Sequence, residues 1–370
     1  QRTRGYPVAP PPPGGPSPNL QTPLSAPASL LSALGGGDRG GGRCTSGTWS
    51  GHESYVTFCQ LEDGAAFTCS ADCTIRRWDL HTGQCVQVYQ GHTSIVNRIL
   101  VANNQLFSSS YDRTARVWSV DKGQVSREFR GHRNCVLTLA YSAPWDAPCV
   151  EEAEARGLLV TGSTDGTAKV WQVASGCCHQ TLRGHTGAVL CLVLDELGRT
   201  AFTGSTDATI RAWDILSGEQ LRVFREHQGS IICLELVEQL LYSGSADRTV
   251  KCWLADAGQC VRTFPAHRRS VSALKFHAGT LFTGSGDACA RAFDAQSGAL
   301  QRVFRGHALV INCLQVHGHV LYTASHDGAL RLWDLRGLQA PCPRPTGKRS
   351  LSRLFSNRVA CVTAVPLQPT

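Results

Sequence analysis

Methionine is absent from the sequence of 370 residues, and the first residue is Gln1. We therefore expect that the natural start of the chain is missing or that its first segment comes from a wrong exon. No apolar run approaches the ~18–20 residues that a membrane-spanning helix needs, so we expect neither a transmembrane segment nor a membrane partner. Charged residues make up 17% and hydrophobic residues 42% of the chain, which is ordinary for a soluble globular protein and excludes a fibrous one.

Acidic residues are scarce at the two ends of the sequence. Residues 1–43 contain four arginines and one aspartate, and residues 339–370 contain four arginines, one lysine and no acid. The remaining 27 basic and 27 acidic residues lie in 44–338, so the formal charge of +8 belongs to the ends. Positive charge favours nucleic acid as a partner, because Lys and Arg neutralise phosphates. A nucleic-acid-associated or ribosome-assembly factor that uses its basic tails therefore stays an alternative function.

A Gly-His pair, or a close variant of it, recurs seven times along the chain. The steps between successive histidines are 40, 40, 53, 42, 40 and 40 residues, and the long third step contains an insertion at 142–157. Each histidine from the second onwards follows an aromatic residue, usually Trp, by 14 positions. Internal repetition of this length is typical of propellers and solenoids.

Each unit has the pattern of short strands separated by tight turns. The fourth residue after the histidine is always β-branched and apolar, as in Val56 and Ile231, which favours a buried strand. An Asp lies six residues before every aromatic residue, within hairpin-turn sequences such as Thr-Asp-Gly-Thr at 164–167. Four strands in about 40 residues favour a β-propeller over a sandwich.

Through these seven units, which cover roughly residues 44–337, the sequence resembles the WD-repeat β-propeller family. The resemblance implies an all-β, seven-bladed WD-repeat β-propeller over residues 44–338. It also implies a structural network in which the Asp orients the His, and a Ser eight residues before the Trp links the His to the indole N–H. The residues expected in this network are His52, Ser70, Asp72, Trp78, His92, Ser110, Asp112, Trp118, His132, Ser163, Asp165, Trp171, His185, Ser205, Asp207, Trp213, His227, Ser245, Asp247, Trp253, His307, Ser325, Asp327 and Trp333. The sixth unit has Phe293 instead of Trp, so its network is expected to stop short of the aromatic residue.

The last unit is expected to obtain its outer strand from the start of the chain. Residues 341–345 contain three prolines, which cannot form a ladder strand. Residues 44–49 are therefore expected to close a seven-bladed ring, although an eight-bladed parent with an altered N-terminal segment stays an open alternative. The Pro- and Gly-rich residues 1–43 and the basic tail 339–370 lack the blade pattern and are expected to be disordered.

Ser, His and Asp are also the composition of a hydrolase triad, but a triad occurs once in an enzyme. Seven copies at fixed spacing, with no G-x-S-x-G elbow, favour an architectural role. The sequence also lacks a P-loop, an H-E-x-x-H helix and a dinucleotide fingerprint. Cys177-Cys178-His179 looks like a metal cluster, but adjacent strand residues point to opposite faces and no second pair follows. We therefore expect no catalysis, no cofactor and no metal site.

The face that carries the Gly-His and Asp turns is the candidate site, because partners usually dock there in the family that the sequence resembles. Tyr55, Ile95 and Tyr111 lie on neighbouring units and predict an aromatic and apolar patch. Arginines at nearby turn positions predict recognition of an acidic or phosphorylated peptide. The candidate partner-binding residues are Tyr55, Ile95, Tyr111, Arg133, Arg268, Arg269 and His326.

The 17 cysteines fall mostly at equivalent strand positions, as small apolar packing residues do. Free thiols are typical of a reducing compartment, so we expect the cytosol, the nucleus or both. The sequence thus predicts a non-catalytic scaffold that binds protein or peptide partners and forms a monomeric ring within larger assemblies.

Overall fold

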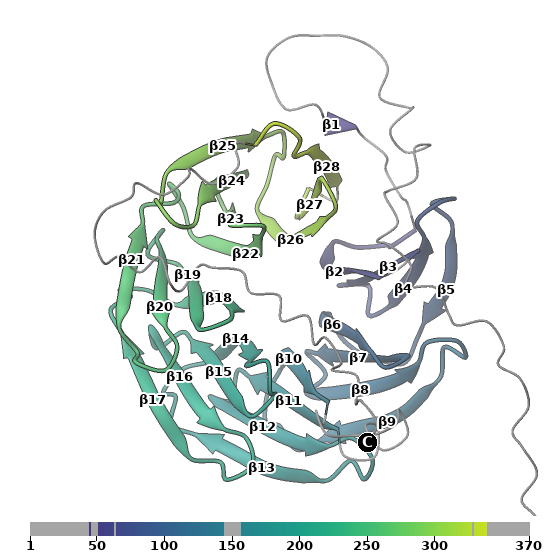
Figure 1. The fold of residues 1–370 in the computed structure, drawn as a ribbon. Coiled ribbons are helices and arrows are strands. Elements are labelled where there is room, and N and C mark those ends of the chain that lie inside the picture. The colour runs from purple at the N-terminus through teal and green to yellow at the C-terminus, as the bar shows by residue number, and fades with distance from the viewer. Residues whose placement is uncertain (1–43, 46–50, 63, 144–156, 328, 339–370) are drawn as a thin grey trace, which may run out of the picture. The chain divides into compact units, whose positions relative to one another are not determined.

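The computed structural model describes residues 44–45, 51–62, 64–143, 157–327 and 329–338 of the chain. Within these ranges the chain forms 28 strands in seven four-stranded antiparallel sheets (Figure 1). The sheets are the seven blades of a β-propeller, and the predicted fold class is confirmed. The ends 1–43 and 339–370 and most of the insertion lie outside the described residues. In the ranges given above, no helix is long and apolar enough to cross a membrane.

Each of the first six blades consists of four consecutive strands, and the first strand of each blade contacts the first strands of its neighbours around the centre. Blades one and two comprise β2 (Val56–Glu62), β3 (Ala65–Ser70), β4 (Ile75–Asp79), β5 (Cys85–Tyr89), β6 (Val96–Ala102), β7 (Gln105–Ser110), β8 (Thr114–Ser119) and β9 (Val125–Arg130). Blades three and four comprise β10 (Val136–Ser142), β11 (Leu158–Ser163), β12 (Thr167–Gln172), β13 (Cys178–Arg183), β14 (Val189–Leu194), β15 (Thr200–Ser205), β16 (Thr209–Asp214) and β17 (Gln220–Arg225). Blades five and six comprise β18 (Ile231–Val237), β19 (Leu240–Ser245), β20 (Val250–Leu254), β21 (Cys260–Phe264), β22 (Val271–His277), β23 (Thr280–Ser285), β24 (Cys289–Asp294) and β25 (Leu300–Arg305).

The seventh blade joins the two ends of the ring. It contains β26 (Ile311–His317), β27 (Val320–Ser325) and β28 (Leu330–Asp334), and its outer strand is β1 (Cys44–Thr45), which pairs antiparallel with β28. The start of the repeat region therefore supplies the last outer strand, as predicted, although only 44–45 of the expected 44–49 are described as strand. On the inner side, the Sγ atoms of Cys59 and Cys313 lie 3.7 Å apart between blades one and seven.

The core lies between the blades, because each twisted sheet buries both of its faces against its neighbours. Phe224 on β17 packs edge-on against Trp253 of the next blade, with ring centroids 5.7 Å apart. Tyr89 and Trp118 make the same contact between blades one and two, at 6.1 Å. In the first six blades, the large apolar residue of the outer strand thus covers the aromatic residue of the following blade, so none of these blades is complete by itself.

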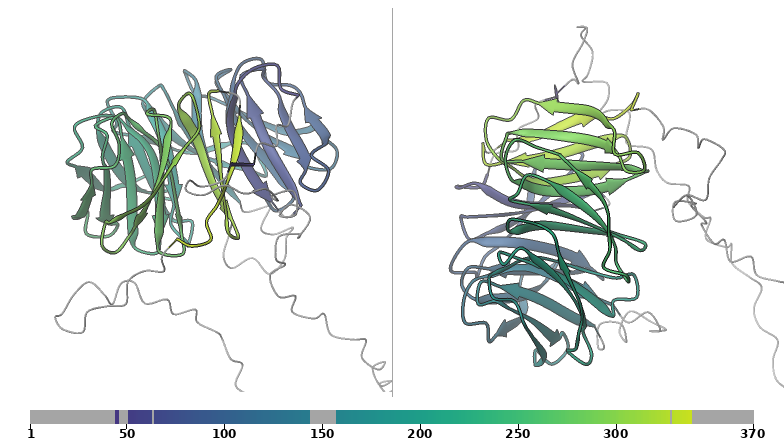
Figure 2. Two further views of the ribbon diagram at one scale, coloured as in Figure 1. Left: turned by 90° about the horizontal axis from the view of Figure 1, so that it is seen from above. Right: turned by 90° about the vertical axis from the view of Figure 1, so that its left-hand side faces the viewer.

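The strands run between the two faces of the ring (Figure 2). One face carries the Gly-His turns, which precede the first strands, and the Asp turns, which join the second and third strands. We call it the Gly-His face. Because neighbouring strands are antiparallel, the turns between the first and second strands and between the third and fourth strands lie on the opposite face.

Candidate interaction face

A repeated chain of hydrogen bonds positions the Gly-His and Asp turns. In blade five, His227 Nδ1 donates to Asp247 Oδ2 at 2.6 Å, and His227 Nε2 lies 2.8 Å from the Ser243 hydroxyl. Trp253 Nε1 donates to the same Ser243 Oγ at 2.8 Å. The backbone N–H of Gln228 also donates to Asp247, which ties the Gly-His turn to the Asp turn.

The hydroxyl that links His to Trp is not the predicted one. In six blades it belongs to the residue ten positions before the Trp, whereas the prediction was the serine eight positions before the Trp. The linking residues are Thr68, Ser108, Thr161, Thr203, Ser243 and Thr323. The reason is strand register. Ser243 on β19 pairs with Lys251 on β20, so Trp253, two residues further along β20, is its diagonal neighbour on the same face of the sheet. Ser245 lies two residues further from Trp253, at the end of β19.

The predicted serines have a different task in the same turns. Each accepts a hydrogen bond from the backbone N–H of the Asp two residues later, as Ser245 does from Asp247 at 3.1 Å. Five of them also donate to a backbone carbonyl of the Gly-His turn, as Ser245 does to Gly229. They therefore shape the Asp turn and do not contact the Trp. The assignment of Ser70, Ser110, Ser163, Ser205, Ser245 and Ser325 as the link between His and Trp was wrong.

The protonation states of the network follow from its surroundings. Although burial by itself raises the pKa of Asp247, hydrogen bonds from Thr249 and His227 lower that pKa to about 2. Burial lowers the pKa of His227, so the imidazole is neutral at pH 7. A neutral imidazole that donates from Nδ1 leaves Nε2 as the acceptor for the Ser243 hydroxyl. All four groups are thereby satisfied, which makes the network a structural element and not a reactive one.

Blade six departs from this pattern as predicted. Thr283 Oγ1 lies 2.7 Å from His267 Nε2, but Phe293 has no N–H to add to the chain. Arg291 contributes a substitute interaction at the other end of the network. Its guanidinium contacts the His267 ring and forms an ion pair with Asp287 at 3.0 Å.

Four of the predicted partner-binding residues line one hollow at the centre of the Gly-His face. The hollow has a volume of about 340 Å³, and Tyr55, Ile95, Tyr111 and His326 contribute to its wall. The rings of Tyr55 and His326 meet across the seam between blades one and seven, with centroids 5.2 Å apart. Tyr55 and Tyr111 are 41% and 39% exposed, so their rings are accessible to a partner.

The residues that form the deeper wall of this hollow were not predicted from the sequence. They are the fifth residues after each histidine, and the strand pairing of every blade is shifted by a β-bulge between the fourth and sixth residues. A bulge redirects one side chain out of the regular alternation, here towards the channel. The available signal was their position, directly after the β-branched fourth residue of each unit. These residues are Thr57, Asn97, Leu137, Leu190, Ile232, Ser272 and Asn312.

Several of these side chains connect neighbouring inner strands. Thr57 Oγ1 donates to the carbonyl of Val96, and Asn97 Nδ2 donates to the carbonyl of Leu137, each at 2.5 Å. Arg98 also lines the hollow, and its guanidinium carbon lies 4.5 Å from the centre of the Phe58 ring. The wall therefore combines fixed polar groups, apolar side chains and one guanidinium.

Arg133, Arg268 and Arg269 do not line the hollow. Arg133 lies on the Gly-His turn of blade three and the other two on that of blade six, and all three are exposed. Within the described part of the chain, their side chains form no hydrogen bond or ion pair. They are separate positive points on this face, and the structure does not bring them together with the aromatic patch.

Metal-ligating side chains show no comparable convergence. Among the residues that the structure describes, no group of three or more His, Cys, Asp or Glu side chains is placed to hold a metal ion. Cys178 Sγ lies near the Gln180 carbonyl and the Thr181 hydroxyl instead.

Comparison with known proteins agrees with this architecture. The family described as WD domain, G-beta repeat matches residues 43–79, 83–119, 123–172, 176–214, 218–253, 258–294 and 298–334. Human WD repeat-containing protein 86 is 83% identical over 155 residues, which are 41% of this chain and 41% of that protein. Cell division control protein 4 of Saccharomyces cerevisiae is 48% identical over 40 residues, 11% of this chain and 5% of that protein. The matched segments thus span less than half the length of these curated relatives.

The fold is also similar to that of a designed protein. The crystal structure of the computationally designed Ika8 protein matches 78% of this chain and 98% of its own, with a TM-score of 0.60 and 27% sequence identity. Seven repeats match the family, and each of them supplies the outer strand of one blade and the three inner strands of the next. The chain therefore belongs to the WD-repeat β-propeller family.

Proposed function

We propose that this chain is a non-catalytic scaffold that binds protein segments on its Gly-His face, over the mouth of the central channel. WD-repeat propellers generally bind protein partners, and the observation that carries the proposal here is the convergence of Tyr55, Ile95, Tyr111 and His326 on one hollow. Aromatic side chains that are partly exposed beside a hollow are typical anchors of protein interfaces. The networks below them keep the turns in place, so little conformational entropy is lost on binding.

The chemistry of the hollow indicates what it would accept. Apolar contact with Tyr55, Ile95 and Tyr111 suits an aliphatic or aromatic side chain of the partner. The Arg98 guanidinium, with the exposed Arg133, Arg268 and Arg269 further out, suits an acidic or phosphorylated side chain in the same segment. We therefore propose a peptide or domain partner with an apolar anchor and a nearby negative charge.

Proximity labelling compares the unaltered chain with the double variant Tyr55→Ala/Tyr111→Ala. We expect the variant to lose its main labelled partners, because both anchors are removed from blades one and two, while its melting temperature stays unchanged. The matched control is Val86→Ala/Val125→Ala, which truncates exposed side chains on the outer strands β5 and β9 of the same blades. Retention of all partners by the tyrosine variant, or an equal loss in the valine variant, would falsify the proposal.

We also propose that the scaffold acts as a monomeric ring in the cytosol or nucleus. Thirteen cysteines in the described part of the chain are free thiols, which supports a reducing compartment. Nuclease treatment before partner capture separates the scaffold from the nucleic-acid alternative. Partners that persist after this treatment support protein contacts, whereas their release would favour the basic ends and nucleic acid.

A further inference from the structure

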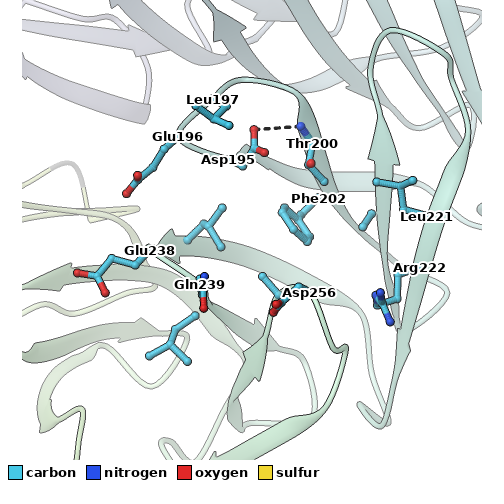
Figure 3. Close-up of a pocket in the computed structure, with 14 residues that line it drawn as sticks. Asp195, Glu196, Leu197, Thr200, Phe202, Leu221, Arg222, Glu238, Gln239 and Asp256 are labelled. Carbon is cyan, nitrogen blue, oxygen red and sulfur yellow. Dashed lines mark hydrogen bonds between the residues drawn. The ribbon is translucent and has the colours of Figure 1, made fainter. Parts of the chain in front are cut away.

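A second hollow lies on the face opposite the Gly-His face, between blades four and five. Its volume is about 820 Å³, and it is bordered by the β14–β15 turn, the β18–β19 turn, the β20–β21 turn and the start of β17 (Figure 3). The β14–β15 turn and β17 belong to blade four, and the other two turns belong to blade five. The hollow therefore exists only when the two blades are packed side by side. The proposed partner face is at the other ends of the same strands.

The inner part of this hollow is apolar. Phe202, Leu236 and Leu240 contribute to its floor, together with Ala212 and Ala255. Leu197 and Leu221 stand at its edges and are 56% and 50% exposed. Single exposed leucines are common on protein surfaces, but two that flank a hollow with an apolar floor are typical of a binding groove.

The rim of the hollow is acidic. Glu196, Glu238 and Asp256 are exposed at its edge, and their carboxylates form no hydrogen bond or ion pair with any described residue. Asp195 has a separate role, because its Oδ1 accepts the backbone N–H groups of Arg199 and Thr200 and so shapes the turn. Figure 3 shows the hydrogen bond from Thr200. Arg222 is a cation in the wall, and its guanidinium is engaged by the carbonyl of Ala257 at 3.3 Å.

We propose that this groove, defined as the hollow between blades four and five, binds a basic peptide segment of a partner protein whose apolar side chains enter the floor. Its three unpaired carboxylates complement Lys and Arg side chains of that segment. A peptide that contains both basic and apolar residues can place basic side chains at the rim while apolar ones reach Phe202 and Leu240. This surface differs in chemistry from the Gly-His face, and the ring could therefore hold two different partners at once.

Fluorescence anisotropy of a labelled probe peptide, GKLKRLFKG, with the full chain tests the proposal. We expect saturable binding that weakens as salt is added, because the rim contacts are electrostatic. The double variant Glu238→Lys/Asp256→Lys should weaken binding by about tenfold, since two attractive contacts become repulsive. Leu221→Ser should weaken it by about threefold through loss of apolar contact.

Matched controls separate the groove from general surface effects. Glu219→Lys reverses one carboxylate at an exposed position of blade four outside the groove, and Leu216→Ser alters a leucine that is 53% exposed outside the groove. Both controls should bind the probe as the unaltered chain does. The charge-reversed peptide GELEELFEG and the apolar-depleted peptide GKSKRSSKG should not bind.

Two outcomes would overturn the proposal. One is equal loss of binding in the groove variants and their controls, or no binding of GKLKRLFKG to the unaltered chain. The other concerns the basic segment KRSLSRLF at 348–355 of this chain. If changing Lys348, Arg349 and Arg353 to Glu strengthens probe binding several-fold, the occupant is this segment and not a partner protein.

Discussion

At the scale of single residues, one hydroxyl in each blade decides whether both the histidine and the tryptophan are satisfied. Thr203 in blade four lies 2.8 Å from His185 Nε2 and accepts the Trp213 N–H at 2.8 Å. Thr283 in blade six keeps the His267 contact but lacks an indole contact, because Phe293 offers no donor. Both threonines are fully buried, so the number of polar partners is the main difference between them.

The substitution Thr203→Val should therefore cost more stability than Thr283→Val. We expect a loss of about 2–3 kcal/mol in blade four, where two buried polar groups are left without a partner, and about 1 kcal/mol in blade six. Urea unfolding of both variants measures the difference. Ser205→Ala is the comparison at the serine that the sequence favoured, and its cost should be below that of Thr203→Val. Equal losses at Thr203 and Thr283 would show that the indole contact has no energetic weight.

At the scale of elements, the β-bulges in the inner strands determine what faces the channel. Each bulge turns the fifth residue after the histidine out of the strand alternation, so that it contacts the neighbouring blade or the hollow. Asn97 on β6 uses this position to donate to Leu137 of the next blade at 2.5 Å. Asn312 holds the same position on β26, where its side chain forms no hydrogen bond with a described residue.

The pair Asn97→Ala and Asn312→Ala isolates this interblade bond. We expect Asn97→Ala to lower the free energy of unfolding by about 1 kcal/mol, since it removes a hydrogen bond between adjacent inner strands. Asn312→Ala should be close to neutral, because it removes only a side chain that lines the hollow. Thermal unfolding of the two variants provides the measurement. A larger loss at Asn312 would contradict the role assigned to the bulge residue.

At the scale of the whole molecule, the buried histidines couple ring stability to pH. Burial lowers the pKa values of His52, His185 and His227, and burial together with the nearby Arg291 lowers that of His267 to about 4. The unfolded chain binds these protons near the ordinary histidine pKa of about 6.5, whereas the folded chain binds them only at lower pH. The unfolded state therefore gains protons first as the solution is acidified.

Stability should be full above about pH 6.5 and fall as the pH decreases towards about 4. The lowered pKa values of the network aspartates extend the loss further, because carboxylates that are hydrogen-bonded in the fold must then be protonated. Denaturant midpoints measured over this range test the sign. In His267→Gln one of these titrations is removed, so its midpoint should depend less steeply on pH. A midpoint that rises on acidification would exclude neutral histidines in the network.

The repeat pattern was sufficient to predict the fold, the His, Asp and Trp residues of the networks and the origin of the last outer strand. These features depend on turn and strand residues that recur at fixed spacing along the chain. The hydroxyl that links His to Trp could not be predicted from the repeat pattern. Ser243 and Ser245 are both serines and lie two residues apart on the same strand, and only the pairing of β19 with β20 shows which one lies near Trp253. Likewise, the turns of all seven units are equivalent along the chain. Only the closed ring places Tyr55 against His326 and keeps Arg268 away from the hollow on the Gly-His face. Only the packing of neighbouring blades brings turns about 40 residues apart together to form the acidic groove between blades four and five.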